Sequence, residues 1–173
     1  MVEEKLLHEF KKGNDEAFNL LVQTIRKKLF VVAMSRMQNE ADAEDVVQET
    51  LVKIYNNINK LKDESKFDSW IMKILINECN RLYKSKDNNC SYEQIDAEYF
   101  VSDGNIFNDV EDNLDFFEIL NSQSKLDRTI LSMYFSKDYT SKQISEILNI
   151  KENTIKSRIK RAADKIKDRK KEV

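Results

Sequence analysis

The sequence of 173 residues contains no proline and only two glycines, Gly13 and Gly104. Sheet-rich folds usually place both residue types in their turns, so this scarcity favours an all-helical chain. A loop that cradles phosphates needs several closely spaced glycines, whereas these two lie far apart. The composition therefore argues against nucleotide chemistry of the P-loop or Rossmann kind.

Residues that bind metals or act as nucleophiles are also scarce. The chain has one histidine, His8, in a polar N-terminal stretch, and two cysteines, Cys79 and Cys90, that do not form a CxxC pair. A structural zinc site needs about four such ligands. No set of His, Cys and paired carboxylates suggests a catalytic cleft. We therefore expect no metal, no cofactor and no enzymatic activity.

Long hydrophobic runs are missing as well. No apolar stretch approaches the roughly 18 residues of a membrane span, and the N-terminal segment MVEEKLLHEF is charged rather than signal-like. Two isolated thiols fit a reducing compartment. These features predict a cytoplasmic protein that does not itself span a membrane.

The charges are unevenly distributed, although the net charge is only −2. Residues 1–85 carry 14 cations and 14 anions, residues 86–118 carry 1 cation and 10 anions, and residues 119–173 carry 14 cations and 7 anions. An acidic middle thus separates a neutral half from a basic one. This pattern predicts two domains, 1–85 and 113–173, joined by an acidic linker at 86–112.

Apolar residues three and four positions apart predict three helices in the first domain. The first covers residues 15–37, the second begins after Asn39–Glu40 and extends to about Ile58, and the third begins at Phe67. A polar loop, Asn59 to Lys66, connects the second and third. Three helices with apolar stripes predict a compact bundle.

Helical periodicity returns after the linker and predicts two helices, one before and one after residues 121–125. Thr140 and Gln143 match the T-x-x-Q capping box before a short helix, and a final helix is expected from about Glu152 to Lys170. Two helices joined by a tight turn form a helix-turn-helix arrangement. In the final helix the spacing turns one face to the core, formed by Ile155, Ile159, Ala162 and Ile166.

The opposite face of the final helix carries candidate DNA-binding residues. Ser157 and Arg161 are suited to base edges, and Thr154 could donate to a phosphate beside the helix N-terminus. The cations expected to hold phosphates are Lys156, Arg158 and Lys160. Lysines on an outer face can be merely solvated, but the turn, the capping box and the basic domain favour DNA binding.

The segment EILNIKENTIKSRIKRA resembles the terminal domains of LuxR-type response regulators as much as those of sigma factors. The first half of the chain favours the sigma factors. Three segments resemble helices of extracytoplasmic-function (ECF) sigma factors. The first helix of the family is similar to GNDEAFNLLVQTI, and its polymerase-binding helix is similar to ADAEDVVQETLVKIY. Its promoter-melting helix is similar to KFDSWIMKILINECNRLYK. The resemblance implies an alternative sigma factor that binds core RNA polymerase and promoter DNA, and that is commonly held inactive by an anti-sigma factor.

The second helix has a polar ridge opposite its apolar stripe, formed by Asp45, Gln48, Glu49 and Val52. An acidic ridge with an adjacent apolar residue does not attract DNA but can meet a basic protein surface. In ECF sigma factors the similar ridge docks on the clamp helices of core RNA polymerase. The alternative is a solvated helix face.

The polar loop and third helix combine cations with aromatic side chains, which suits single-stranded DNA. The resemblance implies that this loop captures a flipped base of the minus-ten element, in a pocket formed by Leu61, Lys62 and Asn77. Trp70 also lies on the apolar side and is better explained as a core residue. The other candidates for minus-ten contact are Lys66, Phe67, Arg81 and Lys84.

One departure from the family concerns the helix-turn-helix. The family often has glycine where this chain has Asn153, and asparagine also tolerates unusual backbone geometry. We therefore expect Asn153 to preserve the turn. A LuxR-like helix-turn-helix regulator that acts without replacing sigma stays open as the alternative function.

Overall fold

The computed structural model describes the backbone of residues 2–86, 120–135 and 139–172, and the side chains of 4–86, 120–135 and 139–165. From residue 87 onward the expected linker lies outside these ranges, as does the side chain of Ile166. The described residues form helices and turns without a strand, which confirms the all-helical prediction. They divide into two compact units. Unit 1 contains Met1–Ala33 and Glu40–Cys90, and unit 2 contains Met34–Asn39 and Ser91–Val173.

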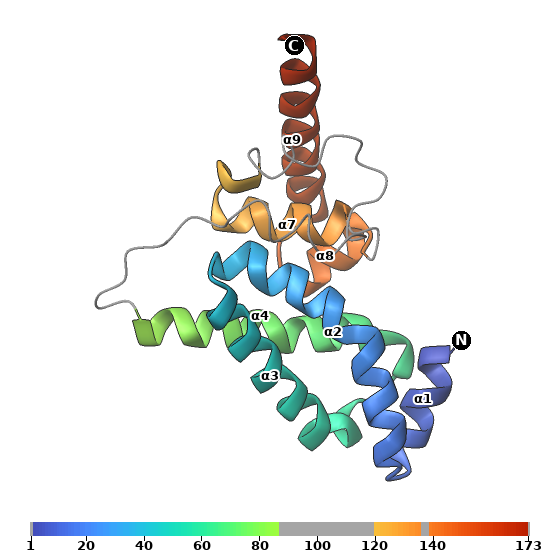
Figure 1. The fold of residues 1–173 in the computed structure, drawn as a ribbon. Coiled ribbons are helices and arrows are strands. Elements are labelled where there is room, and N and C mark those ends of the chain that lie inside the picture. The colour runs from blue at the N-terminus through green and yellow to red at the C-terminus, as the bar shows by residue number, and fades with distance from the viewer. Residues whose placement is uncertain (1, 87–119, 136–138, 173) are drawn as a thin grey trace. The chain divides into compact units, whose positions relative to one another are not determined.

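The helices of the first half are α1 (Val2–Lys11), α2 (Asp15–Met37), α3 (Glu40–Asn57) and α4 (Phe67–Lys86), shown in Figure 1. Two short 3₁₀ turns, η1 (Ile58–Lys60) and η2 (Glu64–Lys66), shape the connection between α3 and α4. The sequence predicted α2, α3 and α4 at nearly these bounds. It treated the stretch that forms α1 only as polar, because a decapeptide with few apolar residues gives a weak periodic signal.

Unit 1 has a core built from one face of each helix. The fully buried side chains include Ile25, Val47, Ile54, Ile71 and Leu75, and α3 packs closely against α4. Burial of such a side chain contributes about 1.5–3 kcal/mol, so this apolar face holds the helices together. It also leaves the opposite face of α3 directed to solvent.

A glycine and an asparagine shape the turn between α1 and α2. Gly13 has φ +92°, a conformation that residues with a side chain rarely adopt. Asn14 then caps α2, because its side-chain oxygen accepts hydrogen bonds from the backbone N–H groups of Glu16 and Ala17. Phe10 of α1 contacts the ring of Phe18, at a centroid distance of 4.6 Å. These contacts fix α1 on the rest of unit 1.

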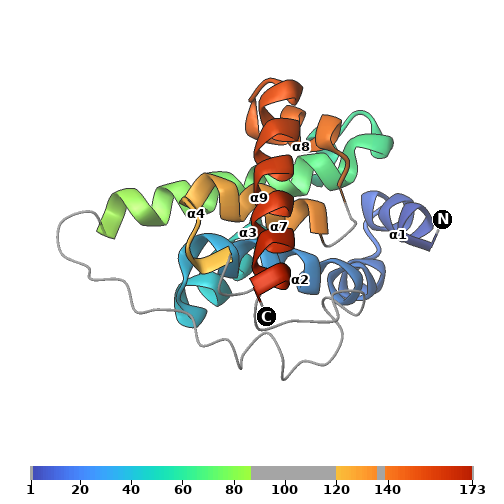
Figure 2. The same cartoon turned by 90° about the horizontal axis from the view of Figure 1, so that it is seen from above.

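Unit 2 contains α7 (Lys125–Phe135), α8 (Ser141–Leu148) and α9 (Glu152–Glu172), with α7 lying across α9 (Figure 2). The predicted capping box at the start of α8 is confirmed, since Thr140 and Gln143 each hydrogen-bond the other's backbone N–H. The buried face of α9 contains Ile155, Ile159 and Ala162, as predicted.

The turn between α8 and α9 depends on a different asparagine from the one expected. Asn149 has φ 54° and ψ 46°, the left-handed conformation at the end of α8, whereas Asn153 lies inside the first turn of α9. The prediction for Asn153 was therefore wrong. Ser145 reinforces the turn, because its hydroxyl donates to the carbonyl of Ile150 at 2.6 Å.

Candidate nucleic-acid and protein interfaces

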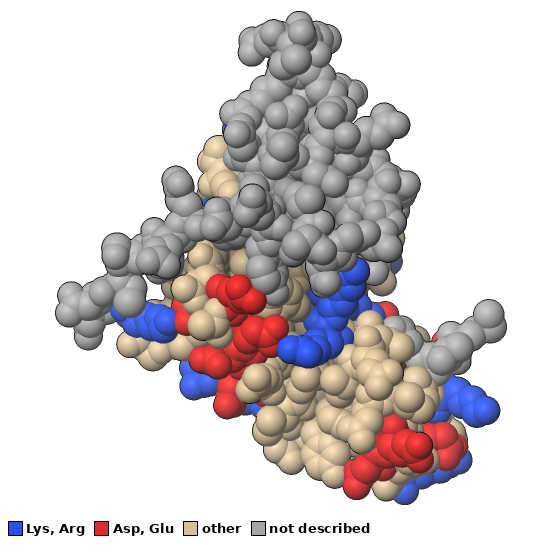
Figure 3. All heavy atoms as spheres, viewed as in Figure 1, with Lys and Arg blue, Asp and Glu red and all other residues tan. Residues whose placement is uncertain are grey.

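The ridge on α3, defined as Asp45, Gln48, Glu49 and Val52, is exposed along its whole length. Val52 is 54% exposed and gives the ridge an apolar component. Figure 3 shows acidic side chains gathered over α3 on the face in view. Exposed carboxylates disfavour contact with phosphates, whereas an acidic surface can meet a basic surface on a partner protein.

Tyr55 extends this ridge by one further turn, although the sequence pattern was not used to include it among the ridge residues. It is 44% exposed, its ring contacts Phe10 and Phe18, and its hydroxyl donates to a carboxylate oxygen of Asp15 at 2.8 Å. The spacing could have revealed it, because Tyr55 follows Val52 by three positions and so lies on the same face. Its ring is held in place by α1 and α2.

A buried carboxylate lies behind the ridge, between α3 and α4. Glu78 is only 3% exposed, and it accepts hydrogen bonds from Lys53 and from Arg81, the latter at 2.8 Å. Burial raises the pKa of Glu78, but the two hydrogen bonds more than offset this, so its pKa lies below the usual range. Glu78 follows Leu75 by three residues and so lies on the apolar stripe of α4. A carboxylate at such a position is expected to be buried and paired with a cation.

Arg81, expected to contact DNA, therefore has partners inside unit 1. Its guanidinium lies 2.8 Å from Glu78 and 4.0 Å from Glu49, a member of the ridge. It is nevertheless 60% exposed at the side chain, so a face of the guanidinium stays accessible to solvent. The structure thus links the ridge on α3 to the cationic side of α4.

The other candidates for minus-ten contact divide into exposed and buried residues. Lys62, Lys66, Asn77 and Lys84 are exposed on the loop and on α4. Leu61 and Phe67 are only 6% and 5% exposed, and the ring of Phe67 contacts Trp70. In this structure these two side chains are core residues and not a base platform. The apolar period of α4 overrides the aromatic signal at Phe67.

The outer face of α9 presents the residues that the sequence singled out. Thr154, Lys156, Ser157, Lys160 and Arg161 are all exposed. Lys156 pairs with Glu152 at 2.8 Å, and the Ser157 hydroxyl donates to the Asn153 carbonyl at 2.7 Å. These residues lie away from the buried Ile155 and Ile159, on the solvent-exposed side of α9.

Arg158 differs from these residues, because its side chain contacts α7 and not the solvent-exposed face of α9. Its guanidinium donates to Asp127 of α7 at 2.6 Å, with side-chain exposures of 26% and 23%. The expectation that Arg158 holds a phosphate is not supported by this geometry, which joins α9 to α7 instead. Burial raises the pKa of Asp127, and the hydrogen bonds from Arg158 and Ser124 more than offset it, so the pKa lies below its usual range.

The ion pair of Asp127 and Arg158 should make the stability of unit 2 depend on pH in the acidic range. Because the folded pKa of Asp127 is depressed, its stabilisation is present above the unfolded pKa of about 3.9 and is lost as the pH falls through the folded value. We expect Asp127→Asn to lower the unfolding free energy by about 1–2 kcal/mol at pH 7, since it leaves Arg158 partly buried without its anion. The variant should also lose stability less steeply below about pH 4.

Methyl NMR signals of Ile144 and Ile155 report on unit 2 and can be followed through urea titrations at several pH values. Glu146→Gln, which neutralises an exposed carboxylate on α8, is the matched control. Coincident pH profiles for Asp127→Asn and the wild type would contradict the assigned role of the pair.

Within the residues that the structure describes, no three His, Cys, Asp or Glu side chains are grouped so that they could hold a metal ion. Over the same residues, no helix has the length and apolar character needed to cross a membrane.

Comparison with known proteins defines the class. Sigma-70 region 2 matches residues 21–89, and sigma-70 region 4 matches residues 120–168. The ECF RNA polymerase sigma factor SigW of Bacillus subtilis is 27% identical, covering 96% of both chains. The ECF RNA polymerase sigma-E factor of Haemophilus influenzae is 26% identical, covering 98% of this chain and 95% of that one.

Solved structures share the fold. CnrH, in complex with the cytosolic domain of CnrY, matches with a TM-score of 0.69 and 20% identity over 97% of this chain and 96% of that one. The sigma factor RpoE of Bartonella quintana, in complex with the anti-sigma factor NepR, matches with a TM-score of 0.64 and 21% identity over 87% and 94%.

Two helical units, one with an exposed acidic ridge and one with a helix-turn-helix, are the architecture of a transcription initiation factor. The two matched regions together span more than half of the chain, and relatives match it over nearly its whole length. The chain belongs to the ECF sigma factors of the sigma-70 family. The predicted resemblance is confirmed.

Proposed function

We propose that this alternative sigma factor docks on core RNA polymerase through the α3 ridge and directs the enzyme to promoters with a distinct pair of elements. The observation that carries the docking step is the ridge itself, acidic and partly apolar, on a helix whose opposite face is fully buried. A buried stripe fixes the helix, so its outer face is free for a partner. The polymerase supplies the metal ions and the chemistry, and the chain catalyses nothing itself.

In this proposal the two domains read different promoter elements. Residues 113–173 bind the minus-thirty-five element, with Ser157 and Arg161 at base edges and Thr154, Lys156 and Lys160 at phosphates. Residues 1–85 bind the single-stranded minus-ten element, and residues 86–112 connect the two domains. The minus-ten contacts come from Lys62, Lys66, Asn77, Arg81 and Lys84, while Leu61 and Phe67 shape the loop from below.

A separate inhibitory partner is part of the same proposal. RpoE of Bartonella quintana was solved in complex with an anti-sigma factor, and CnrH with the cytosolic domain of CnrY. By analogy with these two fold relatives, we expect this chain to be held by an anti-sigma factor in the cytoplasm until an inducing signal releases it.

The proposal predicts promoter-specific transcription that requires both this protein and core polymerase. Run-off transcription on genomic fragments, followed by mapping of start sites, should reveal a shared pair of elements upstream of the new starts. The protein alone should bind duplex DNA weakly. A LuxR-like regulator would instead bind duplex operators tightly by itself and would stimulate only polymerase that already carries another sigma factor.

A further inference from the structure

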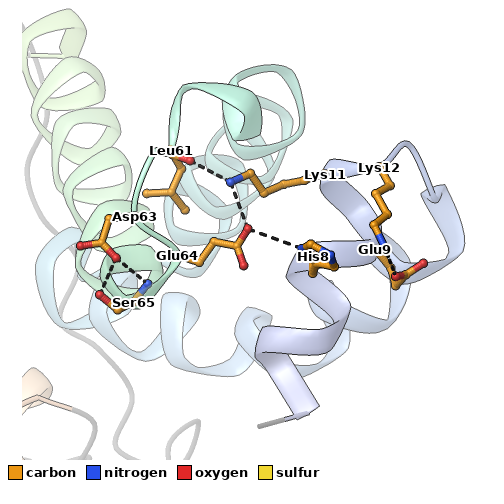
Figure 4. Close-up of polar contacts among 8 residues, drawn as sticks. All are labelled: His8, Glu9, Lys11, Lys12, Leu61, Asp63, Glu64 and Ser65. Carbon is orange, nitrogen blue, oxygen red and sulfur yellow. Dashed lines mark hydrogen bonds and ion pairs between the residues drawn. The ribbon is translucent and has the colours of Figure 1, made fainter.

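The loop between α3 and α4 is tied to α1, which lies about fifty positions earlier in the chain. The ammonium group of Lys11 donates to the backbone carbonyl of Leu61 at 2.9 Å and to a carboxylate oxygen of Glu64 at 3.1 Å. His8 adds a nearby imidazole, with Nδ1 3.9 Å from the same Glu64 oxygen. Figure 4 shows these side chains converging from α1 on the loop. We call the contacts of Lys11 with Leu61 and Glu64 the loop latch.

The loop latch is more shielded than an ordinary surface ion pair. The side chains of Lys11 and Glu64 are 22% and 33% exposed. By contrast, Lys12, the residue after α1, pairs with Glu9 of α1 at the same 3.1 Å, with exposures of 59% and 41%. Exposed pairs contribute little because water screens them, whereas a shielded ammonium that also donates to a carbonyl holds its partners more firmly.

The loop latch holds the two sides of the segment that presents the exposed side chain of Lys62. The Leu61 side chain is anchored in the core, and Asp63 accepts hydrogen bonds from the backbone and hydroxyl of Ser65 at 3.1 and 2.6 Å. Lys62 lies between these two anchored residues and is exposed. Lys11 also balances the charge of Glu64, which would otherwise repel a nearby phosphate.

The attachment of α1 does not depend on Lys11. Leu7 and Phe10 are 1% and 5% exposed, and Phe10 contacts the rings of Phe18 and Tyr55. A substitution of Lys11 should therefore release the loop without detaching the helix. This separates the role of the latch from the stability of unit 1.

We propose that Lys11 and Glu64 are positioning residues for capture of the minus-ten element. Through the latch, α1 holds the loop in the conformation that receives a base from the opened strand. The inference rests on the proposed function, since it assigns a role within promoter opening. It identifies α1 as part of the minus-ten site, although none of its residues is required to touch DNA.

The test compares Lys11→Met with Lys12→Met, which removes the same charge from the adjacent residue, just after α1. Promoter opening, measured by permanganate reactivity of unpaired thymines with core polymerase, should fall about tenfold for Lys11→Met, as expected for loss of a charge-assisted hydrogen bond. Lys12→Met should behave like the wild type. Lys11→Arg can donate to the same two oxygens and should restore opening. Affinity for core polymerase should be unchanged in all three variants.

Hydrogen exchange of the free protein provides a readout that needs neither polymerase nor DNA. The amides of Leu61, Ser65 and Lys66 are hydrogen-bonded within the loop, and they should exchange faster in Lys11→Met, while α3 and α4 stay protected. Equal exchange in the Lys11→Met and Lys12→Met variants would overturn the latch. Faster exchange with undiminished opening would overturn the positioning role and leave the proposed function intact. If the wild type itself failed to initiate, the proposed function would be the part that is wrong.

Discussion

Replacing Asp45 and Glu49 by arginine should reduce the affinity for core RNA polymerase by about a hundredfold or more, because like charges brought together in an interface cost several kcal/mol. Both side chains are exposed on the ridge, and the apolar stripe that holds α3 in place is untouched. The fold should therefore survive, since surface changes usually alter stability by less than about 0.5 kcal/mol. Affinity can be measured by titrating labelled protein with core enzyme.

The control for this experiment makes the same change in net charge elsewhere on unit 1. Glu4→Arg with Glu16→Arg alters two exposed carboxylates of α1 and α2 that lie off the ridge. This pair should leave polymerase binding near the wild-type value. If both double variants weakened binding equally, the effect would come from overall charge, and the ridge would not be the docking surface.

Replacing Arg161 by alanine should weaken binding to the minus-thirty-five element by about 1–3 kcal/mol and relax the preference at one base position. Arg161 is exposed on the outer face of α9, and its Nε donates a long hydrogen bond to the Ser157 carbonyl, at 3.4 Å. The planar guanidinium keeps further N–H donors for a bidentate contact with guanine. Competition between promoter variants on holoenzyme measures the change at each position.

Lys156→Ala is the comparison, since a phosphate contact carries no sequence information. It should weaken all promoters alike and reduce the salt dependence of binding, because fewer counterions are released. An equal loss across all base variants for Arg161→Ala would reassign Arg161 to the phosphates.

Much of this protein could be predicted from its pattern of residues. The three- and four-residue spacing located α2, α3 and α4, and the T-x-x-Q motif located the start of α8, because both signals depend on neighbours within one or two turns. The same periodicity turned Asp45, Gln48 and Glu49 outward. The order of the segments was enough to indicate an ECF sigma factor.

Local patterns were less informative where a residue's role depends on a distant partner. Arg158 resembles its neighbours Lys156 and Lys160 in sequence, yet it contacts Asp127 on another helix. Phe67 resembles a stacking residue beside lysines, yet its ring is buried. The turn before α9 could have used either asparagine, and only the backbone geometry identifies Asn149.

The sequence by itself determined the helical class, the positions of α2, α3 and α4, the exposed ridge and the family, since each depends on short-range spacing or on the order of segments. Only the tertiary structure decided which cations remain available to a partner. Lys11, in a stretch that appeared merely polar, reaches a carbonyl and a carboxylate fifty positions away. The physical reason is that an ion pair or buried contact forms wherever the fold brings two groups together. The periodicity of the sequence does not give the distance between groups that are far apart in the chain.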